Sequence, residues 1–310
     1  MPRDSLEGTV SFKTAMAAYL VLAGALAVPS VGVAATLYGV DNYPGCGFDD
    51  ENCAQLAAVD PDSRSGRVVG DLNTYLGMDV RDLAYRRGGA LYAAGTSSFG
   101  VGGALLKINL RNGASAVALD FGEECEQDDS CVDALEFDDN GTLYGNSFAK
   151  GLLTIDLETG ATTPVGQVSR GIFGNLAFGG GKLFSFSREV VDDDVITHLV
   201  TVDRSTGAVK NVGEIDRFFR ALTYLNGLLY SVDDMTLYTL DPLTAVSTPV
   251  GPIGGLPEFE RINSLAAVPL PAGIPLLAAA LALLYAVRRT GGRQRHNPTQ
   301  AAANGGALSL

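Results

Sequence analysis

The chain has 310 residues but contains no tryptophan and only two histidines. His198 lies on the same predicted strand face as Val200, which makes it a packing residue, and His296 lies in the C-terminal tail. The sequence also lacks a Gly-x-Ser-x-Gly turn, a glycine-rich phosphate loop and a histidine metal cluster. Hydrolase chemistry of the Ser-His kind therefore has no candidate residues.

Basic residues are scarce. Residues 36–268 hold 33 Asp and Glu against 16 Lys and Arg, while the net charge of the whole chain is −13. Because a nucleic-acid partner needs a basic surface, we expect no nucleic-acid binding. The missing tryptophan also weakens the case for carbohydrate binding, although eleven tyrosines could provide stacking faces.

The four cysteines form two close pairs, Cys46 with Cys53 and Cys125 with Cys131. In an exported chain such pairs are most simply two local disulfides, each of which would order an acidic loop. Metal ligation by the thiols is the alternative. It is disfavoured because the spacings differ from those of zinc knuckles and no histidine is nearby.

Glycines recur at a constant interval of 47 residues, at Gly66, Gly113, Gly160 and Gly207. Each follows a polar turn that begins with Asp or Asn, and a shorter fifth copy runs from Asp241 to Ala245. This is the period of a β-propeller blade. We expect the Asp or Asn to bond nearby backbone N–H groups while the glycine takes the positive-φ position, so these aspartates are turn-formers.

Four short strands can be recognised around each turn, and they predict an all-β, five-bladed β-propeller of four-stranded blades over residues 36–268. The chain enters this array without a first strand, at Thr36–Asp41, and leaves it after a first strand, at Asn263–Val268. Pairing of these two segments would close the ring and remove an exposed sheet edge.

Acidic residues cluster in connections that should emerge on one face of the propeller, and such a face could concentrate cations. Solubility and loop disorder are the simpler reading. The alternative is Ca²⁺, the one cofactor we consider, because it takes oxygen ligands from loops. Its candidate ligands are Asp49, Asp50, Glu51, Asp128, Asp129, Asp192, Asp193 and Asp194.

The residues just before the recurring leucine of each first strand should line the mouth of the central channel. They are Arg81, Asp82, Asp133, Asn175, Arg220 and Asn263, with Glu136 one step further in. Such a ring could bind a sugar or a small anion, or its charges could simply neutralise one another. Since glycosidases need only two or three carboxylates, Asp82, Asp133 and Glu136 are the candidate catalytic residues of an alternative carbohydrate-active hydrolase.

Both ends of the chain carry short apolar segments. Residues 1–35 have the form of a secretory signal with cleavage before Thr36. Residues 269–289 contain the apolar run Ile274–Val287, which ends at arginines, and residues 290–310 form a polar tail. Fourteen residues reach only about 21 Å of a roughly 30 Å hydrocarbon core, so this is a marginal span whose arginines should stay cytoplasmic.

The order Val268-Pro269-Leu270-Pro271-Ala272, an apolar helix and then Arg288-Arg289 resembles the VPLPA-type variant of the PEP-CTERM sorting signal of Gram-negative bacteria. The resemblance implies export, transient anchoring in the inner membrane and cleavage by an exosortase-type enzyme, commonly in bacteria that make exopolysaccharide. The repeats resemble those of secreted bacterial propellers. The sequence therefore predicts a cell-surface or extracellular propeller that acts as a non-enzymatic binding or scaffold module, with surface polysaccharide or an envelope protein as possible partner.

Overall fold

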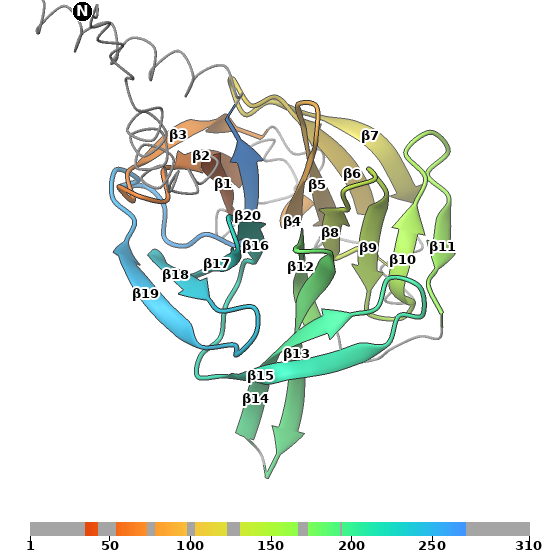
Figure 1. The fold of residues 1–310 in the computed structure, drawn as a ribbon. Coiled ribbons are helices and arrows are strands. Elements are labelled where there is room, and N and C mark those ends of the chain that lie inside the picture. The colour runs from red at the N-terminus through yellow and green to blue at the C-terminus, as the bar shows by residue number, and fades with distance from the viewer. Residues whose placement is uncertain are drawn as a thin grey trace, which may run out of the picture. The chain divides into compact units, whose positions relative to one another are not determined.

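The computed structural model describes residues 35–42, 54–72, 78–97, 103–122, 131–166, 173–192 and 194–270, in which every regular element is a β-strand (Figure 1). These strands form five four-stranded antiparallel sheets. The predicted signal segment up to Ala34, both acidic cysteine loops before Ala54 and Cys131, and everything after Leu270 lie outside the described residues.

Each sheet forms one blade, whose four strands lie side by side from the first to the last. Blade 1 consists of β20 (Ser264–Pro269), β1 (Ala35–Asn42), β2 (Ala54–Val59) and β3 (Gly66–Asp71). Blade 2 consists of β4 (Met78–Arg86), β5 (Ala90–Ser97), β6 (Gly103–Ile108) and β7 (Ser115–Gly122). Blade 3 consists of β8 (Ala134–Phe137), β9 (Leu143–Ser147), β10 (Gly151–Ile155) and β11 (Thr162–Pro164).

Blade 4 consists of β12 (Phe173–Gly179), β13 (Lys182–Val191), β14 (Asp194–Val202) and β15 (Val209–Ile215). Blade 5 consists of β16 (Thr223–Leu225), β17 (Leu228–Asp233), β18 (Thr236–Leu240) and β19 (Ser247–Pro252). The first strands contact one another in the cyclic order β20, β4, β8, β12, β16 and back to β20, so they line the centre of a ring (Figure 1). The predicted five-bladed propeller is confirmed.

The ring closes through the predicted pairing of the first and last strands. Strand β1 pairs antiparallel with β20, and Leu37 lies opposite Ala267. The Asn263 N–H donates to the Val40 carbonyl at 2.8 Å, which continues the ladder. The pairing extends slightly beyond the predicted limits, because Ala35 lies opposite Pro269. Blade 1 is therefore built from both ends of the described chain.

The core consists of apolar layers between neighbouring blades. Alternate residues of the third strands are buried as predicted, for example Leu106 and Ile108 of β6 and Leu153 and Ile155 of β10. Each layer joins side chains of two adjacent sheets, since an apolar face of one blade packs on an apolar face of the next. Within the described ranges no helix is long and apolar enough to cross a membrane.

The repeated turns use their first residue as predicted. In each, one side-chain oxygen accepts from one or two backbone N–H groups two or three residues ahead; in the third turn, Asp156 Oδ1 accepts from Glu158 N at 2.9 Å and Thr159 N at 2.8 Å. The equivalent residues in the other turns are Asp60, Asn109, Asp203 and Asp241. These residues are structural in all five turns.

The prediction for Gly66 is wrong. The residue with positive φ is the fifth of each turn, which is glycine at Gly113, Gly160 and Gly207 but Arg64 (φ 59°) in the first turn and Ala245 (φ 62°) in the last. Gly66 instead begins β3, where its N–H donates to the Gly254 carbonyl at 2.7 Å. A Cβ there would lie 2.6 Å from the Leu256 side chain, so glycine is needed for close approach.

Candidate functional site

Asp82 of β4 is the central polar residue of the ring and is completely buried. Its Oδ1 accepts from Leu83 N at 2.9 Å and from Asn175 Nδ2 at 2.7 Å. Its Oδ2 accepts from Leu135 N at 3.0 Å and Leu176 N at 3.1 Å, which belong to β8 and β12. One carboxylate thus joins the first strands of three blades.

Glu136 of β8 makes a similar link one strand further on. Its Oε1 accepts from Phe137 N at 2.8 Å, and its Oε2 accepts from Phe178 N of β12 at 3.3 Å. On the other side of the ring, Thr223 of β16 accepts through Oγ1 from Ala267 N of β20 at 3.0 Å. The first strand of a blade has no strand partner on its inner side, and these side chains supply the acceptors that its N–H groups lack.

Burial shifts the pKa values of Asp82 and Glu136 in the same direction. It raises the pKa of Asp82 to about 7, against the opposing effect of the hydrogen bonds that the carboxylate accepts. Burial also raises the pKa of Glu136 well above its usual value, and the nearby Asp82 charge adds to that rise. Two interacting carboxyl groups with raised pKa values resemble an acid–base pair, but both are already engaged by backbone donors.

The other residues predicted at the channel mouth differ in exposure and in the contacts that they make. Arg81 is exposed and donates from Nε to Thr96 Oγ1 at 2.6 Å, whereas Asn175 is buried against Asp82. Arg220 lies over the Phe218 ring, 5.3 Å from its centroid. Asp133 and Asn263 are both half-buried. That these residues line the mouth of the channel stays a prediction, and Asp82 and Asn175 are enclosed among the first strands, at 0% and 3% exposure.

Besides Thr223, three further structural polar residues were missed by the sequence analysis. Asp41, which is 3% exposed, accepts through Oδ2 from Glu260 N at 2.9 Å and so ties β1 to the segment before β20. Asp138 and Arg204 form a 2.7 Å ion pair between blades 3 and 4. Their partners are distant in sequence, so no local pattern could have indicated these contacts.

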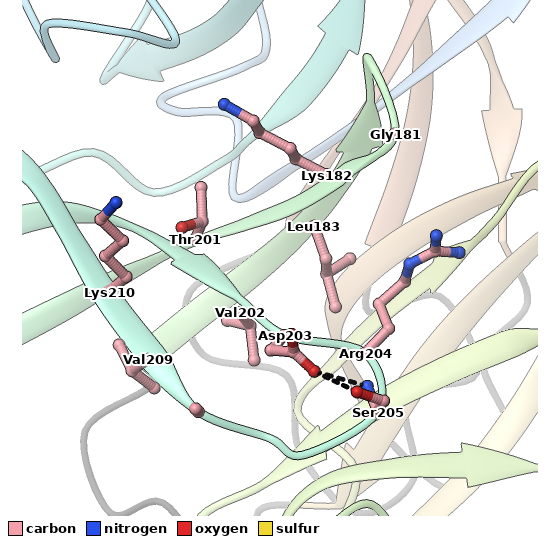
Figure 2. Close-up of a pocket in the computed structure, with 11 residues that line it drawn as sticks. Gly181, Lys182, Leu183, Thr201, Val202, Asp203, Arg204, Ser205, Val209 and Lys210 are labelled. Atoms are coloured by element: carbon pink, nitrogen blue, oxygen red, sulfur yellow. Dashed lines mark hydrogen bonds between the residues drawn. The ribbon is translucent and has the colours of Figure 1, made fainter.

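A groove of about 590 Å³ lies on blade 4 and is shown in Figure 2. Lys182, Thr201 and Lys210 are among the residues that line it. The carboxylate in this groove belongs to Asp203, which accepts from the Ser205 hydroxyl and backbone N–H. The Ser205 contacts lower the pKa of Asp203 to about 2, as expected for a turn-forming carboxylate. This acid is therefore used by the turn.

A second groove, of about 490 Å³, lies beside the β13–β14 hairpin, which projects from blade 4 (Figure 1). Arg188, Val195, Thr197, Arg217 and Phe218 are among its lining residues. No sequence motif indicated this groove. The signal available was the length of the hairpin, since β13 with ten residues is the longest described strand and its partner β14 has nine.

Most predicted calcium ligands and cysteines lie outside the described residues: Asp49, Asp50, Glu51, Asp128, Asp129, Asp193, Cys46, Cys53 and Cys125. Asp192 and Asp194 are exposed beside the β13–β14 turn. Within the described part of the chain, no group of three or more His, Cys, Asp or Glu is placed to hold a metal. Cys131 is buried at 7% exposure, and its pairing with Cys125 stays a prediction.

His198 is largely buried, as expected of a packing residue. Its side chain is 15% exposed, and Nε2 lies 3.6 Å from the Glu189 carboxylate. Nδ1 lies 3.1 Å from Asn211 Nδ2, so the neutral ring accepts there when its proton is on Nε2. These contacts fix the ring on the sheet surface rather than present it to a groove.

The predicted sorting motif is divided between the described and undescribed parts of the chain. Val268 and Pro269 belong to β20, and Leu270 follows that strand. Pro271, Ala272, Arg288 and Arg289 lie outside the described residues. The first two motif residues are therefore part of the propeller.

Comparison with known proteins gives no family. No protein-family model matches the chain, and no curated protein matches it. Similar solved structures include a chain of a nidogen–laminin complex, with 12% identity, a TM-score of 0.47 and coverage of 76% of this chain and 98% of that one. Another is a protein of unknown function from Bacteroides thetaiotaomicron VPI-5482, with 14% identity, a TM-score of 0.48 and coverage of 76% and 65%. Likeness at this level says nothing about activity or ligand.

Proposed function

We propose that this chain is an exported β-propeller that acts as a non-enzymatic binding or scaffold module at the cell surface or in the extracellular matrix. Its blades would form a rigid frame, and its edges and grooves would contact other molecules. Residues 1–35 would direct export, and the segment from Val268 onward would act as a sorting signal of the VPLPA type.

The main support for a non-enzymatic role is the use of Asp82. A catalytic carboxylate must reach substrate or water, whereas Asp82 is fully buried and accepts four hydrogen bonds from three blades. Glu136 is likewise engaged by two backbone N–H groups. These contacts favour a structural role for the polar centre of the ring.

One observation favours the alternative of a carbohydrate-active hydrolase. Burial raises the pKa of both Asp82 and Glu136, and such perturbed carboxyl groups also occur in active sites. The hydrolase would use one as acid and the other, or Asp133, as base or nucleophile.

The two functions can be separated by an activity assay combined with a stability measurement. The purified chain is incubated with a panel of neutral and acidic polysaccharides, and new reducing ends are measured. Our proposal expects no turnover by the wild type, and it expects Glu136→Gln to lower the melting temperature. Turnover that disappears in Glu136→Gln or Asp133→Asn with an unchanged melting temperature would establish the hydrolase instead.

Delivery to the surface is part of the proposal. The apolar run Ile274–Val287 would hold the exported chain in the inner membrane for a short time, oriented by Arg288 and Arg289. An exosortase-type enzyme would then cut the chain and release the propeller. Surface polysaccharide or an envelope protein would be the ligand of the released module.

A further inference from the structure

Three side chains with oxygen acceptors lie in a row across blade 1. Asp41 of β1 is directly opposite Gln55 of β2, and Gln55 is directly opposite Asp71 of β3. These strands lie side by side in the sheet (Figure 1). Directly paired residues project from the same face of a sheet with their Cβ atoms about 4.5–5.5 Å apart, so the three side chains are neighbours on one face. We call them the blade 1 triad.

Asp41 is the most enclosed member of the triad, at 3% exposure. Its Oδ2 accepts from Glu260 N at 2.9 Å and from Arg261 N at 3.4 Å. Its Oδ1 is buried and accepts no hydrogen bond from the described residues. In the chain without a bound ion, burial raises the pKa of Asp41. Half of this carboxylate is thus removed from water without a partner, which is unfavourable.

Gln55 carries a second buried acceptor that has no donor. Its Nε2 donates to Asp71 Oδ1 at 2.8 Å, whereas its Oε1 is buried and accepts nothing from the described residues. Turning the amide would not satisfy it, because Oε1 would then face Asp71 Oδ1. Two directly paired residues therefore each hold an oxygen atom without a donor. Since buried polar atoms are normally satisfied, a further atom between them is indicated.

The charge of the triad favours a cation as that atom. Asp41 and Asp71 carry two carboxylates, and within the described residues no lysine or arginine side chain forms an ion pair with either. The charge of Arg261 lowers the pKa of Asp41 less than burial raises it. A divalent cation would balance the two carboxylates, which a water molecule cannot do.

The ligand atoms and their spacing fit Ca²⁺. Carboxylate and amide oxygens are its usual protein ligands, whereas zinc sites are built mainly from nitrogen and sulfur. Ca²⁺ binds oxygen at about 2.3–2.6 Å, so ligands on opposite sides of the ion lie about 5 Å apart. Directly paired side chains have this spacing. The triad contains only two acids, so it differs from a cluster of three or more acids, which the described part of the chain lacks.

We propose that the blade 1 triad binds a Ca²⁺ ion through oxygen atoms of Asp41, Gln55 and Asp71. Backbone carbonyls and water would complete its coordination by six to eight oxygens. The ion would connect β1 to the outer strand β3 and would stabilise Asp41 in its contacts with the segment before β20. This inference does not depend on the absence of enzymatic activity, because the triad lies in blade 1 and is separate from Asp82.

The test is a calorimetric titration of the purified full-length chain with CaCl₂, after treatment with a chelator. We expect the wild type to bind Ca²⁺ and Asp71→Asn to bind it at least tenfold more weakly, which corresponds to about 1.4 kcal/mol. Asp120→Asn is the matched control. Asp120 lies on β7, the outer strand of blade 2, and accepts from Gly122 N at 2.8 Å. This variant should bind Ca²⁺ like the wild type.

Melting temperatures with and without Ca²⁺ distinguish the loss of a ligand from a folding defect. In chelator, Asp71→Asn should be at least as stable as the wild type, because asparagine still accepts from Gln55 and the repulsion of two carboxylates is removed. In excess Ca²⁺ the wild type should melt at a higher temperature, and Asp71→Asn should not. A purely structural role of Asp71 would lower the melting temperature equally in both conditions.

Two outcomes would overturn the proposal. A wild type that binds no Ca²⁺ would mean that water or a proton satisfies Asp41 and Gln55. Binding that is lost in Asp49→Asn/Asp50→Asn but retained in Asp71→Asn would place the ion among the acidic residues between β1 and β2 instead of at the triad.

Discussion

At the scale of single residues, aspartate has two different roles in this chain. In the repeated turns it is exposed and accepts hydrogen bonds from its own neighbours, as Asp156 does from Glu158 and Thr159. In the centre of the ring Asp82 is buried and accepts from other blades. The two roles differ in what removal of the carboxylate leaves behind, because water can replace it only at the surface.

Asp82→Ala should destabilise the protein strongly. The change leaves three backbone N–H groups and the Asn175 amide without their acceptor in the buried centre. We expect a loss of at least about 3 kcal/mol in the free energy of unfolding. The control Asp156→Ala removes an exposed turn acceptor and should cost about 1 kcal/mol or less. Chemical denaturation measures both losses. Equal losses would contradict the role of Asp82 as a hydrogen-bond acceptor that joins three blades.

The raised pKa of Asp82 predicts a pH dependence. The folded pKa of Asp82, about 7, lies above its unfolded value of 3.8, so the protonated carboxyl group favours the folded state. Its contribution to the free energy of unfolding is fully present below pH 3.8 and is lost as the pH rises through 7. The shift corresponds to about 4 kcal/mol. Asp41 and Glu136 contribute to the same loss of stability with rising pH, because burial raises their pKa values too.

Denaturation midpoints between pH 5 and pH 8 test this prediction. Asp82→Asn carries no titrating group and should show a smaller loss of stability across that range than the wild type. The turn aspartates do not interfere, since their hydrogen bonds lower the pKa values of Asp60, Asp156 and Asp203, and their contribution is lost only as pH falls below 3.8. A wild-type profile that is flat from pH 5 to pH 8 would argue against a raised pKa.

At the scale of elements, the turns show which residue a repeat requires. The fifth turn residue has a positive φ, a conformation that glycine adopts without cost and that Ala245 adopts with strain. We expect Gly160→Ala to destabilise the chain by about 1 kcal/mol, because alanine is strained at this positive φ. Ala245→Gly relieves the same strain but removes a buried methyl group worth about 0.8 kcal/mol, so it should change stability by less than about 0.5 kcal/mol. Thermal melting of both variants is the measurement, and a Gly160→Ala variant as stable as the wild type would contradict the strained position.

Strand β20 is the element on which ring closure depends. Removal of Ser264–Pro269 would expose the inner edge of β1 and leave Thr223 Oγ1 without its donor, Ala267 N. We expect a sharp fall in melting temperature and increased aggregation. A chain that ends after Leu270 keeps β20 and should melt like the full chain; equal melting of the two truncations would contradict the closure of blade 1.

At the scale of the whole molecule, the repeats predicted the blades and the ring because each blade is a local unit with its own turn and alternating strands. The sequence could not show that Asp82 reaches Leu135 and Leu176, which are distant in the chain and meet only when the ring closes. It also placed Gly66 in the turn series, because a glycine needed for close approach to Leu256 happened to lie at the repeat interval. The strands and turns within each blade were therefore predictable from the sequence, and the contacts between blades were not.

The position of β20 limits where the proposed sorting enzyme can cut. Val268 and Pro269 are part of the sheet and lie opposite Thr36 and Ala35, so cleavage before Pro269 would remove part of the closing strand. We expect the surface protein to begin at Thr36 and to end after Pro269 but before Ile274. Intact-mass analysis of the surface fraction measures both ends.

A variant with Arg288→Gln and Arg289→Gln is the control for this processing step. It should be retained and cut less efficiently than the wild type, because the positive charges that orient the segment are lost. Since the change lies beyond the propeller, the melting temperature of the exported domain should not change. If wild-type surface protein still carried peptides from residues 297–310, a permanent membrane tether would replace cleavage, and the propeller would then act where the tether holds it.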